Sequence, residues 1–288
     1  MHTQTTFQDD KAVLYLVSTP IGNLKDFSLR AIETLNAVDV IYAEDTRTSG
    51  VLLKHHNITT KLRSYHEHNE QERQEEIVRL LGEGDNIALI SDAGTPLISD
   101  PGETLIKKVR DAGFGVSNIP GPTAIISALV ASNLQTSPFT FIGFLPSKKN
   151  LKEKLLKDLS ALPHTLIFFE SPHRIHKTLA TLYDVLGNRQ TCLARELTKR
   201  YESFIHFTLS EHEKIPDLKG EIVLVIDGAK QQELSSHDMI EHVQLLIADG
   251  KSEMEAIKMV AKLRNLKKNT VYMAYKTQKK SDEPDNRE

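Results

Sequence analysis

The sequence predicts an α/β protein made of two α/β units and a small C-terminal helical module. Three observations support this prediction. Up to about residue 228, short apolar runs alternate with segments of helical spacing. Several of these runs end in loops rich in glycine and proline. After residue 235 the apolar residues show helical spacing. The expected parts are an N-terminal α/β domain, a second α/β domain, a helix-turn-helix-like module and a flexible tail, at residues 12–130, 131–229, 235–280 and 281–288.

In the first unit, strand-like runs and helices alternate in the order typical of a parallel sheet. Ser28 is a suitable N-cap for a helix with Leu29, Ile32 and Leu35 at helical spacing. The expected strands cover residues 13–18, 38–43 and 86–90, and further helices cover about 70–83, 102–112 and 124–131. Since parallel strands bring their carboxyl ends to one edge of the sheet, ligands are expected at that edge.

The second unit contains strands that follow one another closely. After the run 139–145, strands are expected at 166–169, 191–195, 203–209 and 221–226, with a helix ending near Leu186. The short connection between the strands at 191–195 and 203–209 favours antiparallel pairing. The second sheet is therefore predicted to be mixed.

The C-terminal piece has the pattern of two short helices. Ser252 and Glu255 fit a capping box, followed by an apolar face of Met254, Ile257, Val260 and Ala261. Asn269 or Thr270 is a suitable cap for a second helix over 271–276. Between Lys262 and Lys280 there are seven basic residues and no acidic one, which predicts a local positive patch for RNA that includes Lys267 and Lys268.

The overall composition is that of an ordinary globular protein, with 39% hydrophobic and 26% charged residues. A net charge of −3 gives no strong field for nucleic acid or membrane, so such a partner must meet a local patch. The single cysteine, Cys192, excludes a disulfide framework. The first residues lack a signal-peptide pattern and no apolar run is long enough to span a membrane, so a cytoplasmic protein is expected.

The loop SDAGTPLISDPG, residues 91–102, directly follows the strand at 86–90. It has no G-x-G-x-x-G spacing and no Walker lysine, but it carries two carboxylates, Asp92 and Asp100. Carboxylates would repel a phosphate, so the loop suits an amine, another cation or sugar hydroxyls better. Gly94 and Gly102 permit close backbone approach or a positive φ. The alternative interpretation is an ordinary strand-to-helix connection.

Two further loops lie in the same position, after a predicted strand and before a helix. They are Thr19-Pro-Ile-Gly-Asn23 and Pro120-Gly-Pro-Thr123. In a parallel sheet, three such loops from neighbouring strands would converge on one crevice. This convergence predicts a binding site but does not name its ligand.

Six long motifs occur in the order expected of one family. They are LYLVSTPIGNLKDFSLRAIETL, VIYAEDTRTSGVLLKHHNI, ALISDAGTPLISDPG, IPGPTAIISAL, FFESPHRI and LARELTKRYE. The chain resembles the ribosomal RNA small-subunit methyltransferase I family, the bacterial 16S rRNA cytidine 2′-O-methyltransferases, over about residues 12–228. The C-terminal module resembles the one appended in that family. The loop reads Ser-Asp-Ala-Gly-Thr-Pro where tetrapyrrole methylases carry a Gly-Asp-Pro version, which favours the RNA branch.

The resemblance implies a tetrapyrrole-methylase-like, class III fold with S-adenosylmethionine in the cleft between two α/β domains. It implies methyl transfer to the ribose 2′-OH of a cytidine in the decoding region of 16S ribosomal RNA, and a homodimer. Carboxylates and backbone amides can both bind the sulfonium, ammonium, carboxylate and ribose hydroxyls of this cofactor. Carried over motif by motif, the cofactor-binding residues would be Pro20, Ser91, Asp92, Ala93, Gly94, Ile98, Ser127, Ala128 and Phe169, with Ala194 and Leu224 as further candidates.

Candidate catalytic residues lie where predicted strands end. Glu44 or Lys199 is expected to handle the proton of the acceptor hydroxyl, and Arg47 or Arg174 to contact a phosphate. For each of them a surface ion pair or a helix cap is the alternative, and the sequence assigns no base.

Other polar clusters are less specific. Lys148, Lys149, Lys152 and Lys154 are candidates for the RNA backbone or for a solvated helix face. The pair His66 and His68 has no further partners with metal-ligand spacing, so no metal is expected.

Two other functions stay open at this point. A methylase of a small tetrapyrrole-type molecule would use the same fold, although the basic module and the loop sequence count against it. A non-catalytic ribosome-assembly factor could keep the fold and bind the cofactor without turnover.

Overall fold

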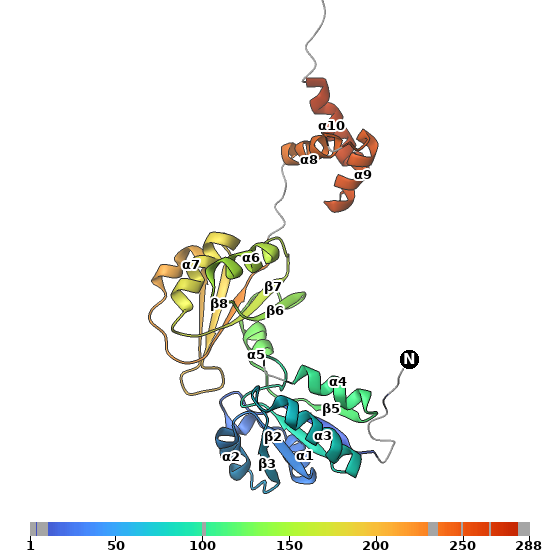
Figure 1. Cartoon of the computed structure of the whole chain (residues 1–288). Coiled ribbons are helices and arrows are strands. Elements are labelled where there is room, and N and C mark those ends of the chain that lie inside the picture. Colours follow the sequence, from blue (N-terminus) through green and yellow to red (C-terminus); the bar gives the residue numbers. More distant parts are fainter. Residues whose placement is uncertain are drawn as a thin grey trace, which may run out of the picture. The chain divides into compact units, whose positions relative to one another are not determined.

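The computed structural model describes residues 4, 11–99, 102–229, 236–248, 250–264 and 266–281 (Figure 1). The chain forms two compact units, Met1–Ala229 and Lys230–Glu288. The first unit contains two five-stranded sheets, and the second unit contains helices. Among the described residues, no helix has both the length and the apolar character that crossing a membrane requires.

The first sheet is entirely parallel, as the alternation of strands and helices predicted. Its strands are β1 (Val13–Val17), β2 (Val40–Ala43), β3 (Lys61–Ser64), β4 (Ile87–Ile90) and β5 (Gly115–Ile119). They lie in the order β3-β2-β4-β1-β5. The carboxyl ends of β4, β1 and β5 are therefore neighbours at one edge.

Helices cover both faces of this sheet. One core cluster joins the sheet to α1 (Leu29–Ala37) and α2 (Thr46–His55), and another joins it to α3 (Glu70–Glu83) and α4 (Glu103–Asp111). Successive residues of β2 alternate between these clusters, as the period of a strand requires. The Ser28 hydroxyl accepts a hydrogen bond from the Ala31 N–H, which confirms the predicted N-cap of α1.

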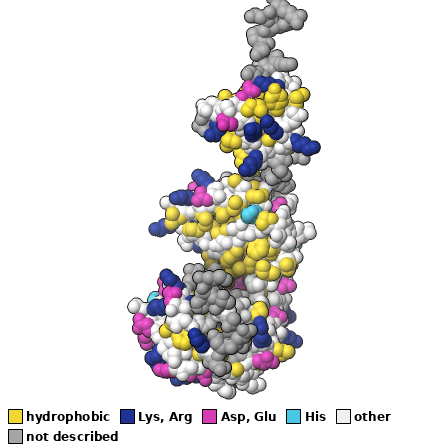
Figure 2. All heavy atoms as spheres, turned by 90° about the vertical axis from the view of Figure 1, so that its right-hand side faces the viewer, with side chains coloured by type: hydrophobic (Ala, Val, Ile, Leu, Met, Phe, Trp, Pro, Cys, Tyr) yellow, Lys and Arg dark blue, Asp and Glu magenta, His cyan; other side chains and the backbone are white. Residues whose placement is uncertain are grey.

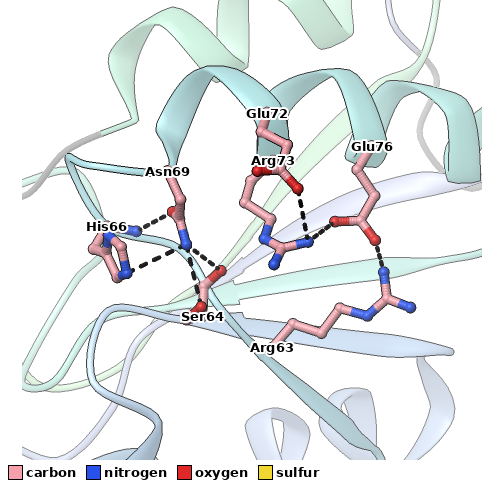
Figure 3. A network of polar contacts seen from close by, with 7 residues as sticks. All are labelled: Arg63, Ser64, His66, Asn69, Glu72, Arg73 and Glu76. Carbon is pink, nitrogen blue, oxygen red and sulfur yellow. Dashed lines mark hydrogen bonds and ion pairs between the residues drawn. The ribbon is translucent and has the colours of Figure 1, made fainter.

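The edge strand β3 was not expected, because Lys-Leu-Arg-Ser offers little apolar alternation. Polar contacts fasten it to α3 instead (Figure 3). Arg63 on β3 and Arg73 on α3 both pair with Glu76, and the Asn69 amide donates to the Ser64 carbonyl. Ion pairs between distant segments leave no period in a sequence, so the pattern could not reveal this strand.

The second sheet is mixed, as predicted. Its strands are β6 (Phe139–Phe144), β7 (Thr165–Glu170), β8 (Gln190–Arg195), β9 (Ser203–Thr208) and β10 (Ile222–Ile226), in the order β6-β7-β10-β8-β9. Only β6 and β7 are parallel, and β10 runs antiparallel to both of its neighbours. One core cluster joins α6 (Lys149–Leu159) and α7 (Ile175–Leu186) to this sheet.

The helix α5 (Ala124–Ala131) follows β5 of the first sheet but packs against the second sheet. Ile125, Ala128 and Leu129 are buried in one cluster with Ile167 of β7 and Val223 of β10. The segments that follow β1, β4 and β5 are thereby held next to one end of the second sheet.

The C-terminal unit contains α8 (Ser236–Ala248), α9 (Glu253–Leu263) and α10 (Lys268–Ser281), which share one hydrophobic core. The capping box of Ser252 and Glu255 is confirmed. Two expectations were wrong. Met254 is 42% exposed, since Ala256 occupies the core position instead. The second helix begins at Lys268, before Asn269 and Thr270, so these residues are not its cap.

Candidate functional site

A cavity of about 580 Å³ lies where the two sheets of the first unit face each other. All three loops predicted to converge contribute to its wall, through Ile21, residues 92–95, Ile98, Ser99 and residues 123–125. The opposite wall comes from the ends of strands in the second sheet. It consists of Phe144, Phe169, Glu170, Ser171, Pro172, Leu197 and residues 220–223.

Backbone pairing fixes the loops that follow β1 and β4 to each other. The N–H of Thr19 donates to the carbonyl of Gly94 at 2.9 Å, and the N–H of Gly94 returns a bond to the Thr19 carbonyl at 3.0 Å. The Ser91 hydroxyl also donates to the Gly94 carbonyl, at 3.0 Å. Gly94 has a φ of +83°, a left-handed conformation that favours glycine. The cavity wall is therefore preorganised.

The third loop approaches equally closely. A Cβ on Gly121 would lie 2.8 Å from the Cβ of Ser18, so a side chain at this position would push the loops after β5 and β1 apart. The glycine of the Pro-Gly-Pro-Thr motif thus serves the close approach of two backbones.

The second sheet contributes through its antiparallel strand. Because β10 runs opposite to β7 and β8, its first residues lie beside their last residues, with Ile222 paired to both Glu170 and Arg195. Residues 220–223 therefore line the cavity together with the end of β7. No local motif in the sequence marks Gly220 or Glu221 as site residues, since only the strand order places them there.

The structure brings five of the expected cofactor residues to the cavity and leaves six behind its wall. Those in the lining are Asp92, Ala93, Gly94, Ile98 and Phe169. The others, which do not line it, are Pro20, Ser91, Ser127, Ala128, Ala194 and Leu224. Of the two expected loop carboxylates, Asp100 lies outside the described residues.

The residues behind the wall have evident structural partners. The hydroxyl of Ser127 donates to the Thr123 carbonyl, and Ala128 and Ala194 belong to the core cluster between α5 and the second sheet. The side chain of Leu224 is buried in the cluster with α6 and α7, whereas its neighbour Val223 reaches the cavity. Thr123, Ala124 and Ile125 line the cavity although only the later part of their motif had been singled out.

Asp92 joins the ends of two adjacent strands. It follows β4, and its Oδ1 accepts a hydrogen bond of 3.1 Å from the backbone N–H of Asp45 after β2. Glu44 lies next to it, and burial, followed by the negative charge of Asp92, raises the pKa of the Glu44 carboxyl. A carboxylate at the cavity and a second one with a raised pKa are thus held at the same sheet edge.

Arg47 is committed to a local ion pair. Its guanidinium makes two hydrogen bonds to Asp45, which caps α2, and its side chain is 90% exposed. Hydrogen bonds from the side chain and backbone of Arg47 lower the pKa of Asp45 to about 2. Arg47 does not line the cavity.

Lys199 is held beside the cavity by two carboxylates. Its Nζ donates to Glu196 at 2.9 Å and to Glu221 at 3.0 Å, and Glu221 lines the cavity. Burial lowers the pKa of Lys199, but the hydrogen bonds to Glu196 and Glu221 outweigh this effect and the pKa is raised. Lys199 is therefore a cation at neutral pH and is poorly suited to act as a base.

The stem of Lys199 also crosses the loop after β1. A Cβ on Gly22 would lie 2.6 Å from the Cγ of Lys199, and Gly22 has a φ of +152°. The glycine of the Thr-Pro-Ile-Gly-Asn motif thus leaves room for a side chain from the second sheet.

A buried polar network supports the opposite wall of the cavity. Glu170 is 3% exposed and accepts hydrogen bonds from the Arg174 guanidinium at 2.9 Å and from the Thr178 hydroxyl at 2.6 Å. The Nζ of Lys152 donates to that hydroxyl at 3.1 Å. Arg174 also donates to Ser147 and to the carbonyl of Leu145.

This network corrects one expectation about RNA contacts. Lys152 was expected on a surface, but it is 4% exposed and cannot reach an RNA backbone. Lys267, in the turn after α9, and Lys268, the first residue of α10, are both exposed. In the described part of the chain, including the surroundings of His66, no group of three or more His, Cys, Asp or Glu side chains could hold a metal ion.

Comparison with known proteins agrees with this geometry. Residues 13–213 match the family model described as tetrapyrrole (corrin/porphyrin) methylases. A protein of Bacillus subtilis named ribosomal RNA small subunit methyltransferase I is 44% identical over 278 residues, which are 93% of this chain and 95% of that protein. Its namesake from Halalkalibacterium halodurans is 45% identical over 286 residues, which are 96% of this chain and 99% of that one.

The chain belongs to the ribosomal RNA small subunit methyltransferase I family. This confirms the resemblance based on the six motifs. The fold also occurs in the uroporphyrin-III C-methyltransferase of Thermus thermophilus, solved with S-adenosylhomocysteine. That structure matches with a TM-score of 0.53 and 16% identity, over 74% of this chain and 96% of that one.

The cavity also fits S-adenosylmethionine, the cofactor of this methylase family. Its volume lies in the range typical of small-molecule sites, and its wall combines apolar side chains with a few fixed polar groups. The exposed carboxylate of Asp92 can accept hydrogen bonds from sugar hydroxyls or an ammonium group, and the turn at Gly94 brings the backbone close to a ligand. S-Adenosylmethionine has each of these groups.

Proposed function

We propose that this protein transfers a methyl group from S-adenosylmethionine to a ribose 2′-OH of a cytidine in the decoding region of 16S ribosomal RNA. The observation that carries the proposal is the cavity built from three strand-end loops and the second sheet, in a chain of this family. Its relatives are named for methylation of small-subunit ribosomal RNA. The ribose position and the cytidine follow from the resemblance of the motifs. Such a substrate places the protein in the cytoplasm.

The described residues divide into those that would bind the cofactor directly and those that would support the cavity wall. Bound S-adenosylmethionine supplies an electrophilic methyl group on its sulfonium. Asp92, the backbone of residues 93–95 and Phe169 would hold it, because they line the cavity. The partly buried Ser127 and the buried residues Pro20, Ser91, Ala128, Ala194 and Leu224 would support that wall from behind. A preformed wall removes much of the entropic barrier to an in-line transfer.

Proton removal is assigned to Glu44 rather than to Lys199. Glu44 does not line the cavity, but it lies at the same sheet edge as Asp92, which does, and its raised pKa favours a general base. Lys199, with its raised pKa, would instead stabilise negative charge that develops on the acceptor oxygen. Arg47 and Arg174 are paired with Asp45 and Glu170, so they would contact RNA phosphates through the N–H groups that these ion pairs leave free.

Loss of one modified nucleotide tests the function directly. Deleting the gene should remove a single 2′-O-methylcytidine from small-subunit RNA, read by mass spectrometry of nuclease fragments. The wild-type gene should restore it, whereas Asp92→Ala should not, because the variant loses a cofactor ligand. Calorimetry should show a large loss of S-adenosylmethionine affinity for Asp92→Ala and none for Asp111→Asn, which changes an exposed carboxylate at the end of α4. An unchanged RNA in the deletion strain would refute the function, and a wild-type affinity of Asp92→Ala would refute the pocket.

The assignment of Glu44 predicts a particular pH dependence. A base acts in its deprotonated form, so kcat/KM should fall as the pH drops through the Glu44 pKa, which lies above the ordinary 4.5. Glu44→Gln should lose about 100- to 10,000-fold in rate and lose this acid limb. The exposed Glu67→Gln is the matched control. If Glu44→Gln keeps both the rate and the limb, the base lies elsewhere.

The turn between α9 and α10 is proposed to contact the RNA backbone. Replacing Lys267 and Lys268 together by Ala should weaken RNA binding and reduce the slope of log K against log salt by about 2, because two phosphate contacts disappear. Lys107 and Lys108, exposed on α4, provide a control with the same change of charge. Equal salt slopes for the wild type and the Lys267/Lys268 variant would remove the turn from the interface.

A homodimer is also proposed, and the second sheet offers a surface for it. The strand β6 is an edge of that sheet, with Phe139 exposed, and Figure 2 shows hydrophobic side chains gathered on this side. Large apolar patches at a sheet edge are typical of subunit contacts. Sedimentation equilibrium at micromolar concentration should give twice the mass of the chain, and Thr140→Lys should shift it toward a monomer. A wild-type monomer would contradict the dimer.

A further inference from the structure

Within the described part of the chain, one aromatic side chain at the cavity contacts a single other ring and is largely exposed. Phe144, the last residue of β6, lines the cavity and is 57% exposed. Its ring contacts that of Phe169 with a centroid distance of 5.6 Å, and Phe169 in turn contacts Phe141 at 5.0 Å. Phe144 is thus supported from one side and open on the other.

The backbone directs Phe144 toward this position. The pairing of β6 with β7 shifts register between Phe141 and Gly143, and Gly143 has a φ of +77°. Such irregularities bend a strand and redirect the side chains that follow. A Cβ on Gly143 would lie 3.5 Å from the hydroxyl oxygen of Ser99, so the bend packs against the loop after β4.

That loop carries backbone strain of its own next to the bend. Leu97 and Ser99 have φ values of +72° and +71°, which residues with side chains rarely adopt. Ser99 and Ile98 both line the cavity. Two irregular backbones therefore meet beside Phe144, and such features concentrate at functional sites.

The charges of the cavity exclude ionic recognition of a nucleotide at this point. The charged side chains in its described lining are Asp92, Glu170 and Glu221, all carboxylates. No Lys or Arg belongs to this described lining, and Glu170 and Glu221 are already paired with Arg174 and Lys199. The cavity therefore offers no free cation to a phosphate, and RNA is expected to present an uncharged part to it. A base that has left its stack offers a π-face, which aromatic side chains bind in single-stranded RNA.

We infer that Phe144 is the stacking platform for the base of the acceptor nucleotide, and so a positioning residue for the ribose whose 2′-OH is methylated. This inference rests on the proposed function and deepens it. The base lies on the open face of Phe144, and Phe169 supports the ring from behind.

A double-mutant cycle between the side chain and the base tests the inference. The substrates are a small-subunit RNA and the same RNA with an abasic ribose at the acceptor position, which keeps its 2′-OH. With the intact base, Phe144→Ala should lower kcat/KM for RNA about 5- to 150-fold, the range of one base–aromatic stack. With the abasic RNA, Phe144→Ala and the wild type should be equally slow, because the stack is already lost.

Two further variants separate stacking from folding and cofactor binding. Phe144→Trp keeps an aromatic face and should retain most of the activity. Tyr183→Ala removes an exposed aromatic side chain on α7, outside the cavity, and should leave kcat/KM unchanged. The S-adenosylmethionine affinity of Phe144→Ala, measured by calorimetry, should stay within about twofold of wild type.

The outcomes are distinguishable from failure of the proposed function. A wild-type protein that does not methylate the RNA refutes that function. If the wild type is active, the inference is overturned by any of three results for Phe144→Ala: an unchanged kcat/KM, the same fold-loss on intact and abasic RNA, or a loss of cofactor affinity. The last result would assign Phe144 to the cofactor instead.

Discussion

The packing of α5 against the second sheet is the constraint on which the site depends. This helix leaves the first sheet directly after β5, yet Ile125, Ala128 and Leu129 are buried against β7 and β10. Burial of such side chains stabilises by about 1.5–3 kcal/mol for each large one. The loops at the edge of the first sheet are therefore held in front of the strand ends of the second. Without this contact there would be two sheets but no common cavity.

Around that contact, glycines allow the backbones of neighbouring loops to approach closely. Gly94 and Gly121 let three loops of the first sheet lie against one another, and Gly22 leaves space for Lys199 from the second sheet. The same side chain is then tied to Glu221 at the cavity. Gly22 therefore lets the two sheets of the first unit pack closely and also lets Lys199 reach Glu221 at the cavity.

The distribution of charge differs between the cavity and the rest of the surface, which suggests that they bind different parts of the substrates. Carboxylates line the cavity, and Lys199 is paired with one of them, Glu221, and with Glu196. Exposed cationic side chains lie elsewhere, as at Lys267 and Lys268. This separation suits a chemistry in which a cationic donor and an uncharged ribose meet in the cavity while the RNA backbone is bound outside it.

Local sequence patterns predicted the strands β1, β2 and β4, the caps at Ser28 and Ser252, the mixed second sheet, and the three loops at the site. These depend on periodicity, capping and turn chemistry, which act between near neighbours along the chain. The other features of the site depend on how the strands and helices are arranged in space. The tertiary structure placed Gly220–Val223 at the cavity because β10 is antiparallel. It buried Lys152 against Thr178 and placed the side chain of Leu224 in the core with α6 and α7. Each of these outcomes depends on which segment lies beside which, and a local pattern carries no such information.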